Sequence, residues 1–430
     1  MVKVFHLAFF GFLLNLLGGG TEPITSVPIV SWQNEPIFAL PTDPDPEVTS
    51  IVGEYLQNLS KRGLKPDGQR VAIETEWADL AEHNSDTAAS AASLTKIATT
   101  LAAIETWPLD HRFETKFYTV GEIRDGVLTG DLVIEGGGDP LFVWEEAIAV
   151  GNALEEMGIR EIEGDLVVTG TFAMNFQTDS LKAGEFFKRG IERSQWSPET
   201  KKAFETLPKG TKAPSVKISG GVRASGEVPA SATALFRHRS LTLTELLRQM
   251  NIYSNNVMAE MLADLAGGPS AVDSIATKYT GVREDEIQLI NGSGLGVENR
   301  ISPRAVIEML KVLDKKLADG PVKLADLFPV GGRDTKGTMK WRAIPEGVMI
   351  KTGTLAQVSA LAGVIPTKER GPVWFAIMNS GSSDIEGLRH RQDEVLQALD
   401  RHWEFLPEQT RGSVPETAFL GDPSRISKGF

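Results

Sequence analysis

Three short stretches of the chain carry residue types that could perform nucleophilic catalysis. The first is Ser93-Leu94-Thr95-Lys96, the only S-x-x-K in the sequence. It opens a helix predicted over residues 91–107, where an i, i+3 spacing places both side chains on one face. A serine hydroxyl is a weak nucleophile until a base removes its proton, and a lysine whose pKa is lowered by burial can be that base. The backbone N–H of Ser93 would supply half of an oxyanion hole. A surface serine and a solvated lysine would give the same pattern.

The second stretch, Ser254-Asn255-Asn256, lies at a predicted break between two helices. The Ser254 hydroxyl could pass a proton to a leaving amine. The Asn256 amide offers both a donor and an acceptor to a substrate peptide group. Serine and asparagine are also favoured helix caps, so capping is the simpler explanation when this stretch is taken alone.

The third stretch, Lys351-Thr352-Gly353-Thr354, falls in a strand predicted over residues 348–355. A strand edge can pair with an extended peptide, and Gly353 would let the substrate backbone approach closely. Lys351 and the hydroxyls of Thr352 and Thr354 would form an anion site for a carboxylate. The Thr354 N–H would complete the oxyanion hole. A Lys-Thr-Gly beside a turn is common and often has no catalytic role.

The conjunction of the three stretches is more informative than any one of them. In this order they form the acyl-transfer set of penicillin-binding proteins and class A β-lactamases. Ser254 follows Ser93 by 161 positions, which leaves room for an inserted domain. The chain most closely resembles class C low-molecular-mass penicillin-binding proteins, the D-alanyl-D-alanine carboxypeptidase/endopeptidase family. Further matches to this family are residues 113–142 with Gly136-Gly137-Gly138-Asp139-Pro140, Asn291-Gly292-Ser293-Gly294-Leu295, and residues 328–342.

The resemblance implies a penicillin-sensitive serine peptidase that acts on peptidoglycan peptide stems through an acyl-enzyme. Ser93 would attack the carbonyl of the penultimate D-alanine, with Lys96 as the base and Ser254 passing a proton to the leaving D-alanine. The residues implied to bind the substrate are Asn256, Lys351, Thr352, Gly353 and Thr354. The family needs no metal or organic cofactor, and β-lactams would be covalent inhibitors.

Two alternatives stay open at this point. A serine β-lactamase would use the same residues, but it needs a group that activates water on the acyl-enzyme, and the sequence does not locate such a carboxylate. A non-catalytic peptidoglycan-binding protein on the same fold would have a decayed site, whereas all three motifs are intact here. An ordinary Ser-His-Asp esterase is disfavoured because the chain lacks a G-x-S-x-G elbow.

The implied fold class is α+β. We expect a penicillin-binding/β-lactamase-like domain, with an antiparallel sheet, flanking helices and a helical subdomain, and a smaller inserted β-rich domain. The peptidase domain is assigned to residues 46–110 and 235–408, the insertion to 111–234 and a flexible tail to 409–430. Helices are predicted over 46–62, near 142–157, after a capping box at Thr242 and Glu245, and over 385–404. Residues 173–232 are polar and weakly patterned, so no elements are assigned there.

Composition and the N-terminus restrict the class of protein further. The chain has 44 Lys+Arg, 57 Asp+Glu and a net charge of −13, which argues against a nucleic-acid partner. It has no cysteine and only six scattered histidines, so we expect no metal site. Lys3 precedes an apolar run over residues 4–17, which predicts that residues 1–20 are a signal peptide or a membrane tether, followed by an irregular lead-in over 21–45. We therefore expect an exported protein of the periplasm or cell envelope, with at most a loose membrane association.

Overall fold

The computed structural model describes residues 44–407 and 419–429. All of these residues belong to one compact unit. The predicted leader over 1–20 and nearly all of the lead-in over 21–45 lie outside the described residues. Within the described ranges, no helix combines the length and the apolar character needed to cross a bilayer.

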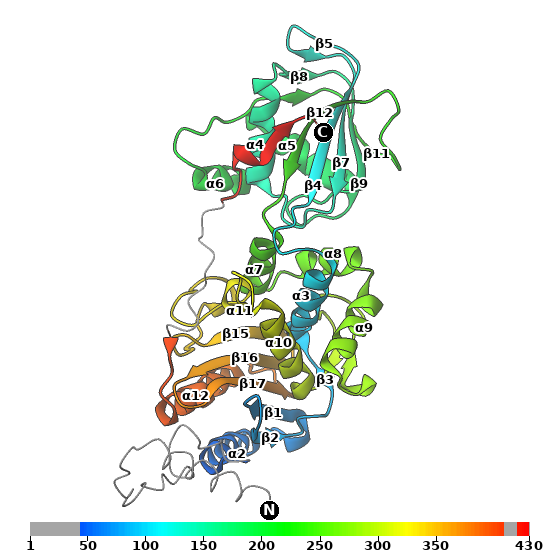
Figure 1. Cartoon of the computed structure of the whole chain (residues 1–430). Coiled ribbons are helices and arrows are strands. Elements are labelled where there is room, and N and C mark those ends of the chain that lie inside the picture. Colours follow the sequence, from blue (N-terminus) through cyan, green and yellow to red (C-terminus); the bar gives the residue numbers. More distant parts are fainter. Residues whose placement is uncertain (1–43, 408–418, 430) are drawn as a thin grey trace, which may run out of the picture. The chain divides into compact units, whose positions relative to one another are not determined.

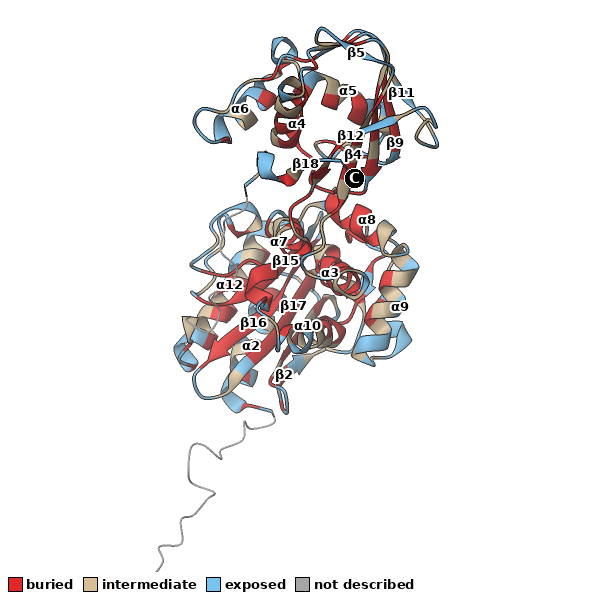
Figure 2. Cartoon of the chain, turned by 45° about the horizontal axis from the view of Figure 1, so that its top comes forward, coloured by how far each residue is buried: buried red, intermediate tan, exposed pale blue. Residues whose placement is uncertain are grey.

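A five-stranded antiparallel sheet brings together strands from distant parts of the sequence (Figure 1). Its strand order is β15-β16-β17-β1-β2, and each neighbouring pair is antiparallel, as predicted for residues 348–379. Its strands are β1 (Gln69–Glu74), β2 (Asp79–His83), β15 (Met349–Leu355), β16 (Val358–Thr367) and β17 (Gly371–Ser380). Every residue of β16 is buried, so both faces of the sheet are covered (Figure 2).

Two helices cover one face of this sheet, namely α2 (Pro46–Lys61) and α12 (Ile385–His402). The side chain of Asp45 caps the first and that of Asp384 caps the second, which satisfies N–H groups that have no partner inside the helix. Apolar residues of both helices form one core with the sheet residues that face them. The helices predicted over 46–62 and 385–404 are confirmed within the usual uncertainty of helix ends.

A helical layer forms a second core with the opposite face of the sheet. Its helices are α3 (Thr95–Thr106), α7 (Leu243–Tyr253), α8 (Asn256–Leu265), α9 (Pro269–Thr280), α10 (Pro303–Leu317) and α11 (Leu324–Leu327). A three-stranded sheet of β3 (Ala89–Ser90), β14 (Arg300–Ile301) and β13 (Ile287–Gln288) lies beside them. The predicted capping box is present, because the Thr242 hydroxyl accepts from the Glu245 N–H and the Glu245 carboxylate accepts from the Thr242 N–H.

Residues between α3 and α7 form a β-rich region with its own apolar core (Figure 1). A six-stranded sheet has the order β11-β9-β7-β4-β12-β18, and a four-stranded sheet has the order β10-β8-β6-β5. The strands are β4 (Glu114–Val120), β5 (Ile123–Arg124), β6 (Val127–Leu128), β7 (Asp131–Gly137), β8 (Glu161–Ile162), β9 (Leu166–Thr171), β10 (Lys217–Ile218), β11 (Val222–Ala224), β12 (Thr233–Arg239) and β18 (Ile426–Lys428), and the helices are α4 (Trp144–Glu156), α5 (Ser180–Gly190) and α6 (Pro198–Thr206). Because β12 continues to Arg239, this sheet extends past the expected boundary at residue 234.

Two sequence expectations fail in this region. Residues 173–232, to which no elements were assigned, contain α5, α6, β10 and β11. The side chains of Asp179 and Ser197 cap the two helices, but α6 buries only Thr200, so its apolar pattern is weak. The second error concerns the tail predicted to be flexible over 409–430. Within it, β18 pairs with β12 and Arg425 is buried, so this expectation is wrong for residues 419–429.

Candidate active site

The turn that carries Ser93 is a short 3-10 helix, η4 (Ala92–Leu94), which precedes α3. Ala92 has φ 47°, a left-handed conformation that costs a non-glycine residue about 1–2 kcal/mol. Neighbouring backbone packs closely around this turn. A Cβ at Gly294 would lie 1.8 Å from the Ala92 carbonyl oxygen, and one at Gly353 would lie 2.8 Å from the Ala91 carbonyl oxygen. Glycines at 294 and 353 therefore let a loop and a strand hold the strained turn in place.

Lys96 lies one turn after Ser93 and is fully buried. Its Nζ is 2.9 Å from Ser93 Oγ, 2.8 Å from Asn256 Oδ1 and 2.7 Å from the Ser293 carbonyl oxygen. These three acceptors match the three N–H donors of an ammonium group. Burial lowers the pKa of Lys96 to about 7, and the negative charge of Glu260 opposes this shift. The amine can therefore lose a proton near neutral pH while it stays within proton-transfer distance of the hydroxyl.

The Ser293 carbonyl is held in place by Glu260 on α8. The Glu260 carboxylate accepts from the Gly292 N–H at 2.9 Å and from the Ser293 N–H at 3.2 Å. The Thr99 hydroxyl donates to the Gly292 carbonyl at 2.6 Å. Sequence reasoning did not assign Glu260, although it follows Asn256 by four residues and so shares its helix face.

Ser254 and Asn256 lie on either side of the break between α7 and α8. Ser254 is the C-cap residue directly after α7 and has a left-handed conformation, with φ 51°. Asn255 caps α8 by accepting from the Met258 N–H, so the capping explanation applies to Asn255 alone. The Ser254 hydroxyl instead accepts from Lys351 Nζ at 3.0 Å. The structure thus brings the second motif into contact with both the first and the third.

Lys351 is fully buried on β15, and its Nζ donates to Ser254 Oγ and, at 2.8 Å, to the Thr352 carbonyl oxygen. Burial and the nearby charge of Lys96 keep the pKa of Lys351 well below its usual value. The proximity of two buried amines disfavours a state in which both are protonated. Protons can therefore move between the amines of Lys96 and Lys351 and the hydroxyls of Ser93 and Ser254 that they contact.

The outer edge of β15 beyond its first two residues has no partner strand among the described residues. The Ile350 N–H points toward this edge, because it donates to the Pro329 carbonyl at 2.9 Å. Backbone groups alternate in direction along a strand, so the N–H groups of Thr352 and Thr354 point toward the same open edge. The Thr352 side chain is buried and that of Thr354 is exposed. An extended peptide could pair with this edge, as the sequence predicts.

The structure explains the glycine at position 353 by a contact other than the predicted one with the substrate backbone. Its missing side chain would point at Ala91 and would also lie 3.2 Å from the Ala360 Cβ. The close approach that this glycine permits is therefore made by the protein's own turn before Ser93. Every predicted site residue thus lies at one of three places, namely the turn and first residues of α3 around Ser93, the break between α7 and α8, or β15.

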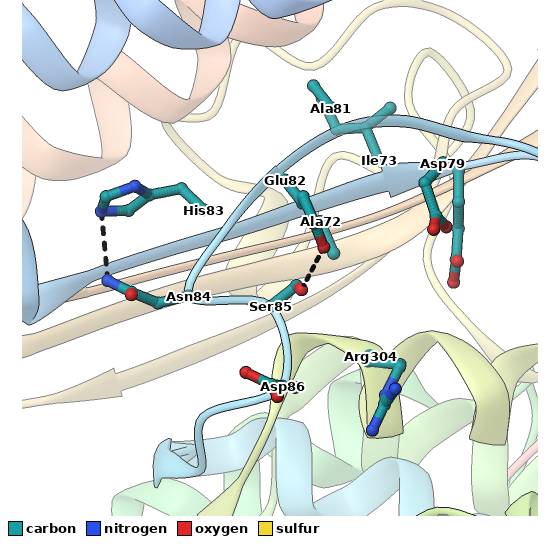
Figure 3. Close-up of a pocket in the computed structure, with 11 residues that line it drawn as sticks. Ala72, Ile73, Asp79, Ala81, Glu82, His83, Asn84, Ser85, Asp86 and Arg304 are labelled. Atoms are coloured by element: carbon teal, nitrogen blue, oxygen red, sulfur yellow. Dashed lines mark hydrogen bonds between the residues drawn. The ribbon is translucent and has the colours of Figure 1, made fainter. Parts of the chain in front are cut away.

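Two other features bear on alternative chemistry. Among residues 44–407 and 419–429, no group of three His, Asp or Glu side chains is arranged to hold a metal ion. A pocket of about 390 Å³ lies along β1 and β2, at the opposite side of the sheet order from β15 (Figure 3). The side chains of Glu82 and Ser85 in it bond to each other, and Arg304 faces it. This pocket contains none of the predicted site residues.

Comparisons with known proteins identify a matching family and several relatives of this chain. The model of the D-Ala-D-Ala carboxypeptidase 3 (S13) family matches residues 56–188 and 184–402. The D-alanyl-D-alanine carboxypeptidase DacB of Haemophilus influenzae is 24% identical over 412 residues, which cover 73% of this chain and 85% of that protein. A D-alanyl-D-alanine carboxypeptidase of an Actinomadura species is 30% identical over 216 residues, covering 46% of this chain and 39% of that protein.

Solved structures show the same fold. The predatory endopeptidase Bd3459 of Bdellovibrio bacteriovorus, acylated by penicillin G and in complex with an immunity protein, has a TM-score of 0.68 and 23% identity, covering 84% of this chain and 99% of that one. Penicillin-binding protein 4 of Haemophilus influenzae has a TM-score of 0.56 and 21% identity, covering 81% of this chain and 98% of that one. The α+β fold with a penicillin-binding/β-lactamase-like sheet and flanking helices is thereby confirmed.

Proposed function

The chain belongs to the D-Ala-D-Ala carboxypeptidase 3 (S13) family, and we propose that it cleaves peptidoglycan stem peptides next to D-alanine through an acyl-enzyme on Ser93. It is a serine-type D-alanyl-D-alanine carboxypeptidase/endopeptidase, a hydrolase that β-lactams acylate. The observation that carries the assignment of Ser93 is the 2.9 Å contact between Ser93 Oγ and a fully buried Lys96.

Acylation begins when neutral Lys96 takes the proton of Ser93 and Ser93 Oγ bonds to the carbonyl carbon of the penultimate D-alanine. Negative charge then develops on the carbonyl oxygen. The N–H groups of Ser93 and Thr354 stabilise that charge, because the Thr354 N–H points to the open edge of β15. The preorganised turn at Ala92 and Ser93 holds its donor without further rearrangement.

The second half of acylation breaks the carbon–nitrogen bond. Ser254 donates a proton to the leaving amine and is reprotonated by Lys351, whose Nζ is 3.0 Å from Ser254 Oγ. The proton that Lys96 took from Ser93 then replaces the one lost by Lys351, so Lys96 is neutral again. Water then attacks the acyl-enzyme, Lys96 takes the water proton, and Ser93 leaves as a hydroxyl. The residues act as one unit, so removal of a single one is expected to remove most of the rate.

Substrate binding is assigned to the groups around the open edge. The Oδ1 of Asn256 accepts from Lys96, and its Nδ2 has no partner among the described residues, so it can donate to a substrate carbonyl. Residues Lys351, Thr352, Gly353 and Thr354 form the strand that pairs with the peptide. A terminal D-alanine and the D-centre of a cross-linked stem both place a carboxylate beside the scissile amide, which fits both the carboxypeptidase and the endopeptidase reaction.

The test is covalent labelling with a fluorescent penicillin, followed by mass spectrometry of the labelled peptide. We expect wild type to carry one adduct on Ser93 that persists for minutes, and Ser93→Ala to carry none. An adduct on another residue would refute the assignment of Ser93. Absence of any label on wild type would support a non-catalytic peptidoglycan-binding protein instead. Release of D-alanine from monomeric muropeptides, compared with cleavage of cross-linked dimers, then separates the two activities.

A β-lactamase finds no specific support in the site. The carboxylate whose charge acts on Lys96 is Glu260, and both of its oxygens already accept backbone N–H groups. It is therefore engaged in holding the loop rather than placed to activate water. Rapid turnover of penicillin by wild type would instead indicate a β-lactamase.

Because the proposed substrate is peptidoglycan, we propose that the protein acts in the cell envelope. We propose that residues 1–20 direct export, either as a cleaved leader or as a loose membrane tether. Mass spectrometry of the N-terminus of protein purified from an envelope fraction would decide between these.

A further inference from the structure

Arg389 places a partly exposed positive charge at the end of the substrate-binding strand. It lies in the second turn of α12, and its Nη2 donates to the exposed Thr354 hydroxyl at 2.9 Å. Its Nη1 donates to Glu386 Oε1 at 2.6 Å. No motif contains this arginine, and sequence reasoning assigned it no role. Its guanidinium contacts the residue whose N–H we assign to the oxyanion hole.

The lysines of the site are poorly suited to bind a substrate anion. Lys96 and Lys351 are fully buried, and their Nζ atoms already contact acceptors of the protein. Burial lowers the pKa of both. An arginine stays protonated throughout the range in which proteins are stable. Arg389 therefore supplies a permanent positive charge at this end of β15.

The planar guanidinium of Arg389 also has N–H donors that make no contact within the described residues. An arginine carries five N–H donors, and within the described residues only two donor–acceptor contacts are made by Arg389. The side chain of Arg389 is 31% exposed, and that of its partner Glu386 is 72% exposed. A carboxylate that enters along the open edge of β15 can replace Glu386 as the partner of the guanidinium in a two-bonded pair.

We propose that Arg389, together with the Thr354 hydroxyl that it contacts, binds the free carboxylate of the leaving D-amino acid. The inference rests on the proposed function, because it names the group that recognises the substrate of that reaction. Glu386 then acts as a resident anion that the substrate displaces. The site would thereby discriminate a peptide with a free carboxylate from one whose C-terminus is blocked.

The experiment compares a blocked peptide ending in D-Ala-D-Ala with the same peptide as its C-terminal carboxamide. Steady-state D-alanine or D-alaninamide release is measured for wild type, Arg389→Ala and Arg389→Lys. We expect Arg389→Ala to raise KM about tenfold for the acid and to leave the carboxamide unchanged, with kcat within about threefold for both. Arg389→Lys should retain part of the preference for the acid, since it keeps the charge but loses the planar fork.

Two further variants separate binding from a merely structural effect. Glu386→Gln should lower KM for the acid by about two- to threefold, because the competing anion is gone, and this gain should disappear in the Arg389→Ala background. Arg391→Ala is the matched control on the same helix, since Arg391 contacts Glu394, and it should match wild type. Equal changes for acid and carboxamide in Arg389→Ala would overturn the proposal.

Failure of the proposed function has a different signature. If wild type is not labelled by penicillin, the proposed function fails and this inference fails with it. If wild type is labelled but releases no D-alanine, the same variants are compared by their second-order labelling rates with benzylpenicillin and its methyl ester. A loss in Arg389→Ala that is confined to the free acid supports the carboxylate site, and an equal loss for both overturns it.

Discussion

Lys96 is buried and contacts three hydrogen-bond acceptors. This environment determines whether its amine is neutral and can accept the proton of Ser93. An ordinary lysine is charged at neutral pH and cannot accept a proton from serine. Desolvation is the largest cause of the lowered pKa, while Glu260 limits the shift. The same carboxylate also holds the loop that supplies the Ser293 carbonyl. Glu260 therefore contributes to both the geometry and the basicity of the amine.

The first prediction concerns the pH dependence of acylation. Lys96 acts as a base only when deprotonated, and its pKa is about 7. The second-order rate of penicillin labelling should therefore rise about tenfold per pH unit below about 7 and level off above it. Stopped-flow or gel-based labelling from pH 5.5 to pH 9 measures this. A profile that is flat between pH 6 and pH 8 would contradict the role of Lys96.

The second prediction separates the hydroxyl of Ser254 from its backbone. Ser254→Ala and Ser254→Gly both remove the proton relay, so both should lower acylation about 100-fold or more. Ser254 has φ 51°, a conformation that glycine adopts without strain. The free energy of unfolding of the glycine variant should therefore exceed that of the alanine variant by about 1 kcal/mol. Denaturant unfolding and labelling rates measure the two quantities. A variant that keeps the wild-type labelling rate would exclude Ser254 as the relay.

At the scale of elements, β15 and the turn before Ser93 must touch for the site to exist. The third prediction is that Gly353→Ala forces them apart, because the added Cβ would lie 2.8 Å from the Ala91 carbonyl oxygen. We expect a destabilisation of about 1–3 kcal/mol and a fall in labelling rate of at least tenfold. Gly53→Ala is the control, because Gly53 lies on the exposed side of α2 and an added Cβ there would have no atom within 4 Å. That change should stabilise the protein by about 0.5–1 kcal/mol. Unchanged labelling in Gly353→Ala would contradict the required contact.

Much of the fold near the site follows from local patterns in the sequence. The capping box at Thr242, the helix break at Ser254 and the strand that contains Lys351 were predictable because their signals lie within a few residues. The site motifs were found in the same way. Arg389 and Glu260 were missed, because their roles depend on contacts between elements that come together only in the folded chain.

The least predictable element is β18. It has three residues, lies in a stretch rich in Gly, Pro and Ser, and pairs with a strand that precedes it by almost 190 residues. Neither its length nor its composition distinguishes it from a loop. Its position is set by pairing with β12 and by the buried contacts of Arg425 just before it, and no local pattern records either.

At the scale of the whole molecule, the C-terminal segment 419–429 completes the fold of the inserted region. Arg425 bonds to Glu146 on α4, and Glu146 also contacts His238 on β12 at 2.8 Å. All three side chains are buried. Burial alone would raise the pKa of Glu146, but His238 and Arg425 outweigh it and lower that pKa. The last residues of the chain thus neutralise a charge that the inserted region buries.

The fourth prediction is that Arg425→Met destabilises the inserted region by about 3–5 kcal/mol, because it removes the arginine partner of a buried carboxylate. Hydrogen exchange measured by mass spectrometry should show faster exchange in α4 and β12 and unchanged exchange in β16 and β17. Lys428→Met, an exposed change in the same segment, should stay within about 0.5 kcal/mol of wild type.

The destabilisation caused by Arg425→Met should depend on pH, and the direction of that dependence follows from the pKa of Glu146. The pKa of Glu146 in the folded protein lies below the ordinary value of 4.5, so the ionised carboxylate stabilises the fold above that pH and this contribution is lost as the pH falls. In Arg425→Met the carboxylate lacks the charge of Arg425 and is protonated more readily, which relieves the buried charge. The difference in exchange between wild type and variant should therefore be largest above pH 4.5 and narrow below it. A difference that is constant with pH would show that Arg425 acts through packing rather than through its charge.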